Sequence, residues 1–210
     1  MNSIKNLEWR YATKKFDATK SLSNSQINTL KEVFNLTATS YGLQPVKMVV
    51  IQNKEIQNQL VTHSWNQNQV AQASHVLVLC IPKEYTNKDV ENYFSLVKSV
   101  RNTPDEILNP FKEMLTSSIA AKTQEELKTW NTNQAYIALG NLMTVAANEQ
   151  IDSCPMEGFI PEKYDEILNL DKHNLTSVLV LPVGFRAEDD FMKDLKKVRR
   201  KTTDVVIEIN

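Results

Sequence analysis

Glycine is scarce in this chain. Four glycines occur among 210 residues, about 2% where an average protein has about 7%. No two of them fit the spacing of GxGxxG or GxxxxGK[ST], so the sequence excludes both the Rossmann fingerprint and the P-loop. If the protein holds a phosphate group, side chains must do most of the binding.

Cysteine and histidine are also rare. Cys80 and Cys154 lie far apart in apolar, strand-like segments, no CxxC pair occurs, and the three histidines show no ligand spacing. A structural zinc site is therefore not expected. The two cysteines are interpreted as buried, reduced thiols of a cytoplasmic protein.

Long apolar runs and an excess of charge of one sign are missing as well. The longest apolar runs, at 76–82 and 178–183, are far shorter than the roughly 20 residues of a membrane helix. The N-terminal MNSIKNLEWR does not resemble a signal peptide. A net charge of -1 argues against a general binder of nucleic acid or of membrane surfaces.

What remains is the composition of an ordinary globular protein, with 41% hydrophobic and 23% charged residues. The hydrophobic pattern predicts helices separated by four or five short strands. Capping boxes at Ser23/Gln26 and Thr123/Glu126 mark two helix starts, Thr103-Pro104 marks a third with proline at the first helical position, and Pro182 suggests an edge strand or a bulge. The expected helices are 3–9, 23–36, 54–63, 87–122, 123–150 and 161–168, and the expected strands are 46–52, 76–81, 151–154, 177–183 and a terminal strand within 199–210. The predicted fold class is α+β or three-layer α/β around one mixed sheet, in a single domain over 1–210.

Two basic clusters lie at opposite ends of the chain. Residues 10–16 (RYATKKF) hold three cations, and 193–201 (KDLKKVRRK) holds six cations and one acid. Taken separately, each is most simply a solvated surface, and the second could also contact nucleic acid. Taken together, they would be explained by one bound anion that both clusters hold.

Two further segments are candidates for a site. In PMEGF (155–159), Gly158 would let a backbone amide approach a planar ligand, although an ordinary turn is an equally simple interpretation. In the long helix, four polar residues at 131–134 precede the small Ala138 and Gly140. Core packing with a solvated turn, or a homodimer seam, would account for this pattern.

The order of these segments resembles the FMN-dependent nitroreductase family, in its short, dimeric, NAD(P)H-dependent bacterial branch. The resemblance covers nearly the whole chain. It is carried by RYATKKFD (10–17), TATSYGLQP (37–45), NQNQVAQASHVLVLC (66–80), WNTNQAYIALGNL (130–142), DSCPMEGF (152–159), SVLVLPVG (177–184) and LKKVRR (195–200). It implies a three-layer α/β/α fold with a mixed, mainly antiparallel sheet, an intertwined homodimer, and a helical lid at about 85–125.

The resemblance also assigns roles to residues near the cofactor. It implies that Arg10, with the pair Lys197 and Arg199, contacts the FMN phosphate, and that Lys14 lies at the pyrimidine side of the ring. The backbone amides of Glu157 and Gly158 would face the N5 and O4 edge. The other implied contacts are Asn66 at the ring, and Thr39 and Ser40 on a loop from the partner subunit.

At three positions the chain departs from the family pattern. Ala12 stands where a serine is usual, Gln69 where some members have a second lysine, and Gly42 where asparagine is frequent. The chain would therefore lack one hydroxyl contact at position 12 and one cation near the ring.

The implied function is an enzyme that uses NADH or NADPH to reduce FMN, and then reduces nitroaromatics or quinones by ping-pong hydride transfer. It would be a cytoplasmic homodimer that binds no nucleic acid, no membrane and no metal. Three alternatives remain open on the sequence. They are a non-catalytic flavin carrier or sensor, a related FMN enzyme for dehalogenation or flavin destruction, and a nucleic-acid binder using 193–201.

Overall fold

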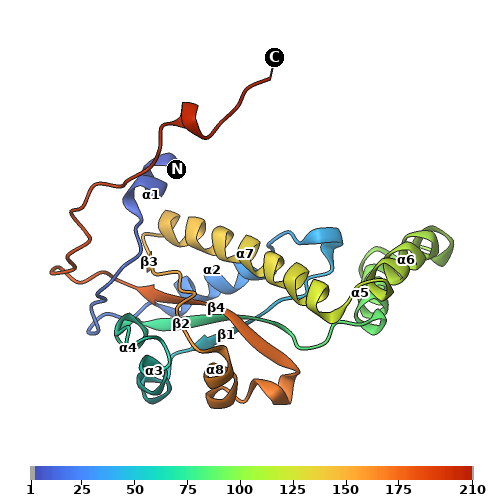
Figure 1. The fold of residues 1–210 in the computed structure, drawn as a ribbon, viewed down its shortest axis with the longest axis horizontal. Helices are drawn as coiled ribbons and strands as arrows, with labels where there is room; N and C mark the ends of the chain where they lie inside the picture. Colours follow the sequence, from blue (N-terminus) through green and yellow to red (C-terminus); the bar gives the residue numbers. More distant parts are fainter. Residues whose placement is uncertain (1–2, 210) are drawn as a thin grey trace.

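The computed structural model describes residues 3–209, which fold around one four-stranded sheet (Figure 1). Its strands are β1 (Lys47–Ile51), β2 (His75–Pro82), β3 (Asp152–Ser153) and β4 (Leu175–Gly184), in the order β1-β2-β4-β3. All three strand pairs are antiparallel, and a parallel bridge joins Ala12 to Ser153. The predicted α+β class with a mainly antiparallel sheet is confirmed.

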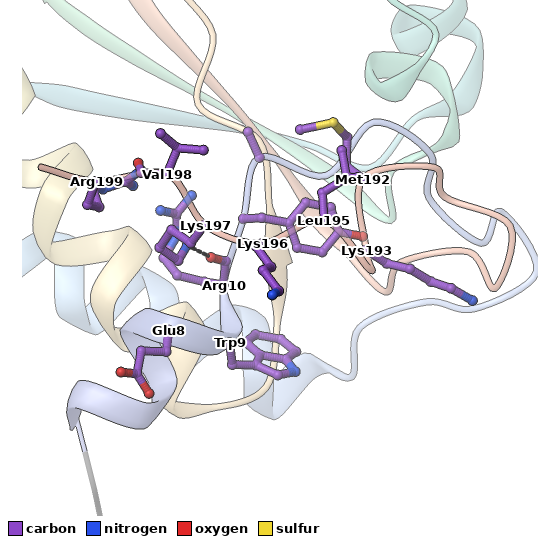
Figure 2. A pocket seen from close by; sticks show the side chains of 12 residues that line it. Glu8, Trp9, Arg10, Met192, Lys193, Leu195, Lys196, Lys197, Val198 and Arg199 are labelled. Atoms are coloured by element: carbon purple, nitrogen blue, oxygen red, sulfur yellow. Dashed lines mark hydrogen bonds between the residues drawn. The ribbon is translucent and has the colours of Figure 1, made fainter.

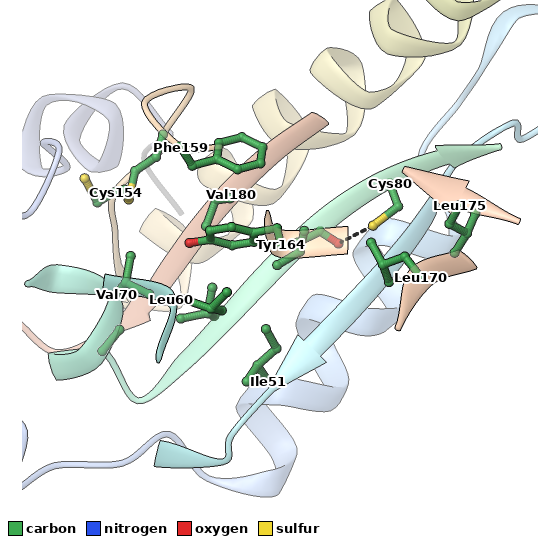
Figure 3. Close-up of a cluster of buried hydrophobic side chains, with 14 of the residues drawn as sticks. Ile51, Leu60, Val70, Cys80, Cys154, Phe159, Tyr164, Leu170, Leu175 and Val180 are labelled. Atoms are coloured by element: carbon green, nitrogen blue, oxygen red, sulfur yellow. Dashed lines mark hydrogen bonds between the residues drawn. The ribbon is translucent and has the colours of Figure 1, made fainter. Parts of the chain in front are cut away.

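Strand β2 shows why the sheet is central. Its apolar run is buried on both faces, as expected for a strand covered by helices on each side. Because side chains alternate along a strand, Val76, Val78 and Cys80 enter one core, whereas Leu77 and Leu79 enter the other. Figure 3 shows the first of these cores.

Helices cover the two faces and make the molecule three layers deep (Figure 1). One face carries α2 (Asn24–Asn35) and α7 (Gln124–Asn148), and the other carries α3 (Lys54–Val61), α4 (Gln69–Gln72) and α8 (Pro161–Ile167). Helix α1 (Ser3–Trp9) packs on α7, where Asn6 donates a hydrogen bond to Asn148 (2.9 Å).

Two helices leave this body as a hairpin: α5 (Asn87–Arg101) and α6 (Asp105–Ala120) (Figure 1). They share a small core of their own that includes Phe94 and Leu115. The hairpin also exposes apolar residues, among them Val100 and Ile107. The hairpin occupies the region that the sequence predicts to be a lid.

Helix α7 is the longest helix and packs along one side. Ala135, Ala138 and Leu142 are buried against the sheet, whereas Tyr136 and Ile137 are exposed, and a side chain added at Gly140 would meet no atom within 4 Å. Residues 3–209 include no helix that is long and apolar enough to cross a membrane.

The predicted helix starts are confirmed with one change. Ser23 with Gln26, and Thr123 with Glu126, form the expected capping boxes. The third start is displaced by one residue, because Pro104 is extended and serves as the N-cap, and α6 begins at Asp105.

The predicted terminal strand within 199–210 is wrong for the residues described. This part contains one 3-10 turn (Thr202–Asp204), and Ile207 and Ile209 are 90% and 94% exposed. Figure 1 shows the segment extending away from the sheet, so it has no strand to pair with. Apolar residues signal burial but do not specify the surface that buries them. Asn210 lies outside the described residues.

The prediction that Pro182 lies on an edge strand or bulge is also wrong. Strand β4 is internal, and its register against β2 shifts at Val178, opposite Leu79 and Cys80, four residues before Pro182. Cys154 donates its N–H to the Pro182 carbonyl (3.0 Å), so the proline nitrogen faces the same side. Residues 154–156 continue to pair with β4 on that side, at Cys154 and again at the Met156–Val180 bridge, so the proline omits one donor from an otherwise continued pairing.

Candidate functional site

The two basic clusters come together where the C-terminal segment crosses the end of α1 (Figure 2). Lys197 Nζ donates a hydrogen bond to the Arg10 carbonyl, joining residues that lie 187 positions apart in the chain. Arg10, Ala12, Lys197 and Arg199 line one cavity of about 430 Å³. The structure therefore places Arg10, Lys197 and Arg199, here called the cation cluster, at a single site.

The cation cluster is not paired with an acid in the described chain, although Glu8 lines the same cavity. None of its three members forms an ion pair among residues 3–209. Arg10 is half-buried, and its Nε has no hydrogen-bond partner. Burial, and then the charge of Arg199, lower the pKa of Arg10, and burial followed by both arginines lowers the pKa of Lys197. Such a cluster is suited to an anion, which would supply both the missing charge and the missing acceptor.

Backbone contacts hold the segment that carries Arg10 and Lys14. Asp190, which is buried, accepts hydrogen bonds at Oδ2 from the amides of Lys14 (2.8 Å) and Lys15 (3.1 Å). On its other side, Thr13 donates its N–H to the Ser153 carbonyl (3.3 Å). The segment is therefore fixed between β3 and the chain that follows β4.

Lys14 and Gln69 meet at the thiol of Cys154. Lys14 Nζ lies 4.0 Å and Gln69 Nε2 3.9 Å from Cys154 Sγ. Burial raises the pKa of the Cys154 thiol, so the sulfur is a neutral, weak acceptor. Two predicted ring-contacting side chains from different elements are thus directed to one point.

The Gln69 side chain continues the site toward Gly158. Gln69 Nε2 donates to Gln67 Oε1 (2.9 Å), and Gln67 Nε2 donates to the Gly158 carbonyl (3.2 Å). A Cβ at Gly158 would lie 2.8 Å from the ring of Trp65, so any other residue there would displace this exposed ring. Asn66 is exposed next to that ring, with a left-handed backbone (φ 57°).

The exposed Glu157 is held from α7. Its Oε1 accepts a hydrogen bond from the Tyr136 hydroxyl (2.6 Å), and this bond, more than burial, raises the pKa of Tyr136 to about 12. The Glu157 carboxylate therefore points to α7. The part of this segment that contacts Gln67 is the backbone, at the Gly158 carbonyl.

The loop with Thr39, Ser40 and Gly42 lies elsewhere in this chain. Ser40 donates its N–H to Gln134 Oε1 (2.8 Å), and Gly42 has φ 74°. Gln134 is 14 residues before Asn148 on α7, about 21 Å along the helix axis. Asn148 is the anchor of α1, so one chain does not bring this loop to the cation cluster.

Several site neighbours were not predicted from the sequence. Asp190 and Gln67 carried no recognisable signal, since a single acid after a strand and a glutamine among other polar residues are common. Cys154 was expected to be buried, which it is, but its contact with Lys14 follows from the pairing of residue 12 with β3. Within residues 3–209, no group of three His, Cys, Asp or Glu side chains could hold a metal ion.

Known proteins resemble this chain in sequence. The model of the Nitroreductase family matches residues 7–185. A Staphylococcus epidermidis protein provisionally named an NAD(P)H nitroreductase is 36% identical over 206 residues, covering 94% of this chain and 92% of that protein.

Solved structures with this fold include a Bacillus subtilis protein described as a nitroreductase (TM-score 0.86, 18% identity, 98% of each chain). Another is an Exiguobacterium sibiricum protein described as a nitroreductase in complex with FMN (TM-score 0.84, 18% identity, 100% of this chain and 98% of that chain). The sequence matches confirm the resemblance and the enzyme class that it implies: the chain belongs to the nitroreductase family of oxidoreductases.

Proposed function

We propose that the protein is an FMN-dependent NAD(P)H oxidoreductase that reduces nitroaromatics, quinones or both by ping-pong hydride transfer. The observation that carries the proposal is the cation cluster at Arg10, Lys197 and Arg199, which share one cavity without an ion pair among residues 3–209. The family supports the redox class, the name of the Staphylococcus relative supports the nicotinamide donor, and the FMN-bound Exiguobacterium structure supports the cofactor.

The residues present fit FMN. A phosphate would supply the acceptor that the buried Arg10 Nε lacks, and would balance Arg10 and Lys197, whose pKa values are lowered first by burial and then by neighbouring cations. Lys14 and Gln69 both contact the Cys154 thiol. Gln69 is in turn linked through Gln67 to the Gly158 carbonyl by two hydrogen bonds. We therefore assign the cluster to the phosphate and this second group to the flavin ring.

When bound, FMN supplies the transfer of hydride from a nicotinamide to an electron-poor acceptor, so the chain needs no nucleophile or general base of its own. The contribution of Lys14 is a positive charge, which stabilises negative charge as it develops on the pyrimidine side of the ring. Gln69 can donate a hydrogen bond there but adds no charge. Ala12, which lines the same cavity as the cluster, offers no hydroxyl.

We propose that the working unit is a homodimer in which Thr39, Ser40 and Gly42 reach the FMN of the partner subunit and the α5–α6 hairpin covers the acceptor pocket. The loop lies about 21 Å along α7 from the anchor of α1 in its own chain. Apolar side chains that a partner could bury are exposed on α7, on the hairpin and on the C-terminal segment: Ile137, Val100, Ile107, Ile207 and Ile209.

A flavin carrier or sensor would use the same phosphate and ring contacts, and differs only in lacking reduction by a nicotinamide. We assign the protein to the cytoplasm, where NAD(P)H is available and where its two free cysteines stay reduced.

Removing one arginine of the cluster should release FMN selectively. Arg10→Ala or Arg199→Ala is expected to weaken FMN binding by about ten- to a hundredfold, because each removes a charge-assisted contact to phosphate. Riboflavin has no phosphate, so its affinity should hardly change. Fluorescence titration with both flavins tests this, and unchanged FMN affinity in both variants would make the cluster a solvated surface.

Lys14→Met should make the bound flavin harder to reduce. It keeps the side-chain length and removes a cation, with an expected loss of about 1.4–3 kcal/mol in stabilisation of the reduced form, or about 30–65 mV in the two-electron midpoint potential. Potentials measured against a reference dye give the result. If a fully flavinated variant kept the wild-type potential, Lys14 would not lie at the ring.

The protein should sediment as a dimer at micromolar concentration. A partner is required to bring Thr39 and Ser40 to the flavin and to bury the exposed apolar residues of α7, the hairpin and the C-terminal segment. Analytical ultracentrifugation of the FMN-loaded protein measures its mass. A stable, flavinated 24.0 kDa species would contradict the shared site.

A further inference from the structure

Arg186 lies between two aromatic rings on either side of Arg10 in the sequence. Its guanidinium carbon is 4.1 Å from the centre of the Trp9 ring and 4.6 Å from the centre of the Tyr11 ring. Arginine stacks well on aromatic faces because its guanidinium is planar and weakly hydrated. The two stacks therefore fix the chain immediately before and immediately after Arg10.

A buried carboxylate fixes Arg186 in turn. Asp152 Oδ1 accepts from Arg186 Nε (2.7 Å) and pairs with Nη2 (2.6 Å), and Asp152 Oδ2 accepts from the Arg186 amide (2.8 Å). The Asp152 side chain is 5% exposed, and it belongs to β3, which pairs with β4. The aromatic stacks are therefore tied to the central sheet.

We infer that Arg186 is a positioning residue for the phosphate site: it holds Trp9 and Tyr11 so that the guanidinium of Arg10 is directed into the cavity. Arg186 does not itself line that cavity, whereas Trp9, Arg10 and Tyr11 all do. Figure 2 shows Trp9 and Arg10 at the end of α1, beneath the C-terminal segment. This inference rests on the proposed binding of FMN.

Arg10 depends on such support because its backbone is bonded at both ends, through its amide and through Lys197 at its carbonyl, whereas its guanidinium makes no hydrogen bond within residues 3–209. Helix α1 ends at Trp9, so Arg10 begins the irregular segment, and its amide makes the last helical bond, to the Asn6 carbonyl (3.0 Å). Its half-buried Nε has no partner. A shift of about 1 Å in a supporting shell is enough to weaken a preorganised contact substantially.

The test is a double-mutant cycle between Arg186 and Arg10. Arg186→Lys keeps a charge for Asp152 but loses the planar stack and the hydrogen bond from Nε. We expect the dissociation constant of FMN to rise about five- to tenfold, while that of riboflavin stays unchanged. In an Arg10→Ala background, Arg186→Lys should have no further effect on FMN binding, because its effect passes through Arg10.

Two further variants separate positioning from loss of stability. Trp9→Leu removes one stack without touching the ion pair, and should reproduce the selective loss of FMN even where Arg186→Lys folds poorly. Asp165→Asn weakens a buried carboxylate that accepts hydrogen bonds from Thr176 and Ser177, so it should lower the melting temperature and leave the ratio of FMN to riboflavin affinity unchanged.

Equal losses for FMN and riboflavin, or additive effects of Arg186→Lys and Arg10→Ala, would overturn the inference and leave Arg186 a purely structural residue. If Arg10→Ala leaves FMN affinity unchanged, the inference fails because Arg10 does not bind the phosphate, and the phosphate site itself fails if Arg199→Ala also has no effect. If Arg10→Ala weakens FMN but neither Arg186→Lys nor Trp9→Leu does, only the positioning role is wrong.

Discussion

Repulsion among three cations held close together is the constraint on which this account depends. Arg10, Lys197 and Arg199 share one cavity and form no ion pair within residues 3–209, and burial lowers the pKa of Arg10 and of Lys197. A folded protein keeps such an arrangement where a ligand supplies the opposite charge, since unpaired charges otherwise destabilise it. The cluster also explains how a chain with four glycines can bind a phosphate, because its side chains replace the backbone amides of a glycine-rich loop.

The rest of the fold brings the two ends of the chain to this place. Strand β4 runs through the middle of the sheet, and the segment after it provides Arg186 and Asp190, which hold residues 9–15 by stacking and by backbone hydrogen bonds. Strand β3 contacts both of these segments: Asp152 binds Arg186, and the Ser153 carbonyl accepts a hydrogen bond from the Thr13 amide. The rigid core thus positions a site that is itself built from irregular segments, as is common for binding sites.

The sequence predicts correctly those features that depend on interactions between residues close together in the chain. The alternation in β2 and the capping boxes at Ser23 and Thr123 depend on nearby residues, and the structure contains them. The charge pattern alone predicted that Arg10 and Lys197 lie close together. The family resemblance added that both contact the FMN phosphate. The roles of Arg186 and Asp190 could not be predicted, since they depend on contacts between segments about 175 residues apart. The C-terminal apolar residues were taken for a strand because a sequence does not reveal which surface will cover them.

The most direct test is anaerobic reduction of the FMN-loaded protein by NADH and by NADPH in a stopped-flow instrument, recorded at the visible flavin band. The account predicts that one equivalent of at least one nicotinamide bleaches the bound flavin, and that a quinone or a nitroaromatic compound then restores the colour. Bound FMN that stays oxidised with both nicotinamides would contradict the enzyme and favour a flavin carrier. A purified protein that binds no FMN would contradict the assignment of the cation cluster itself.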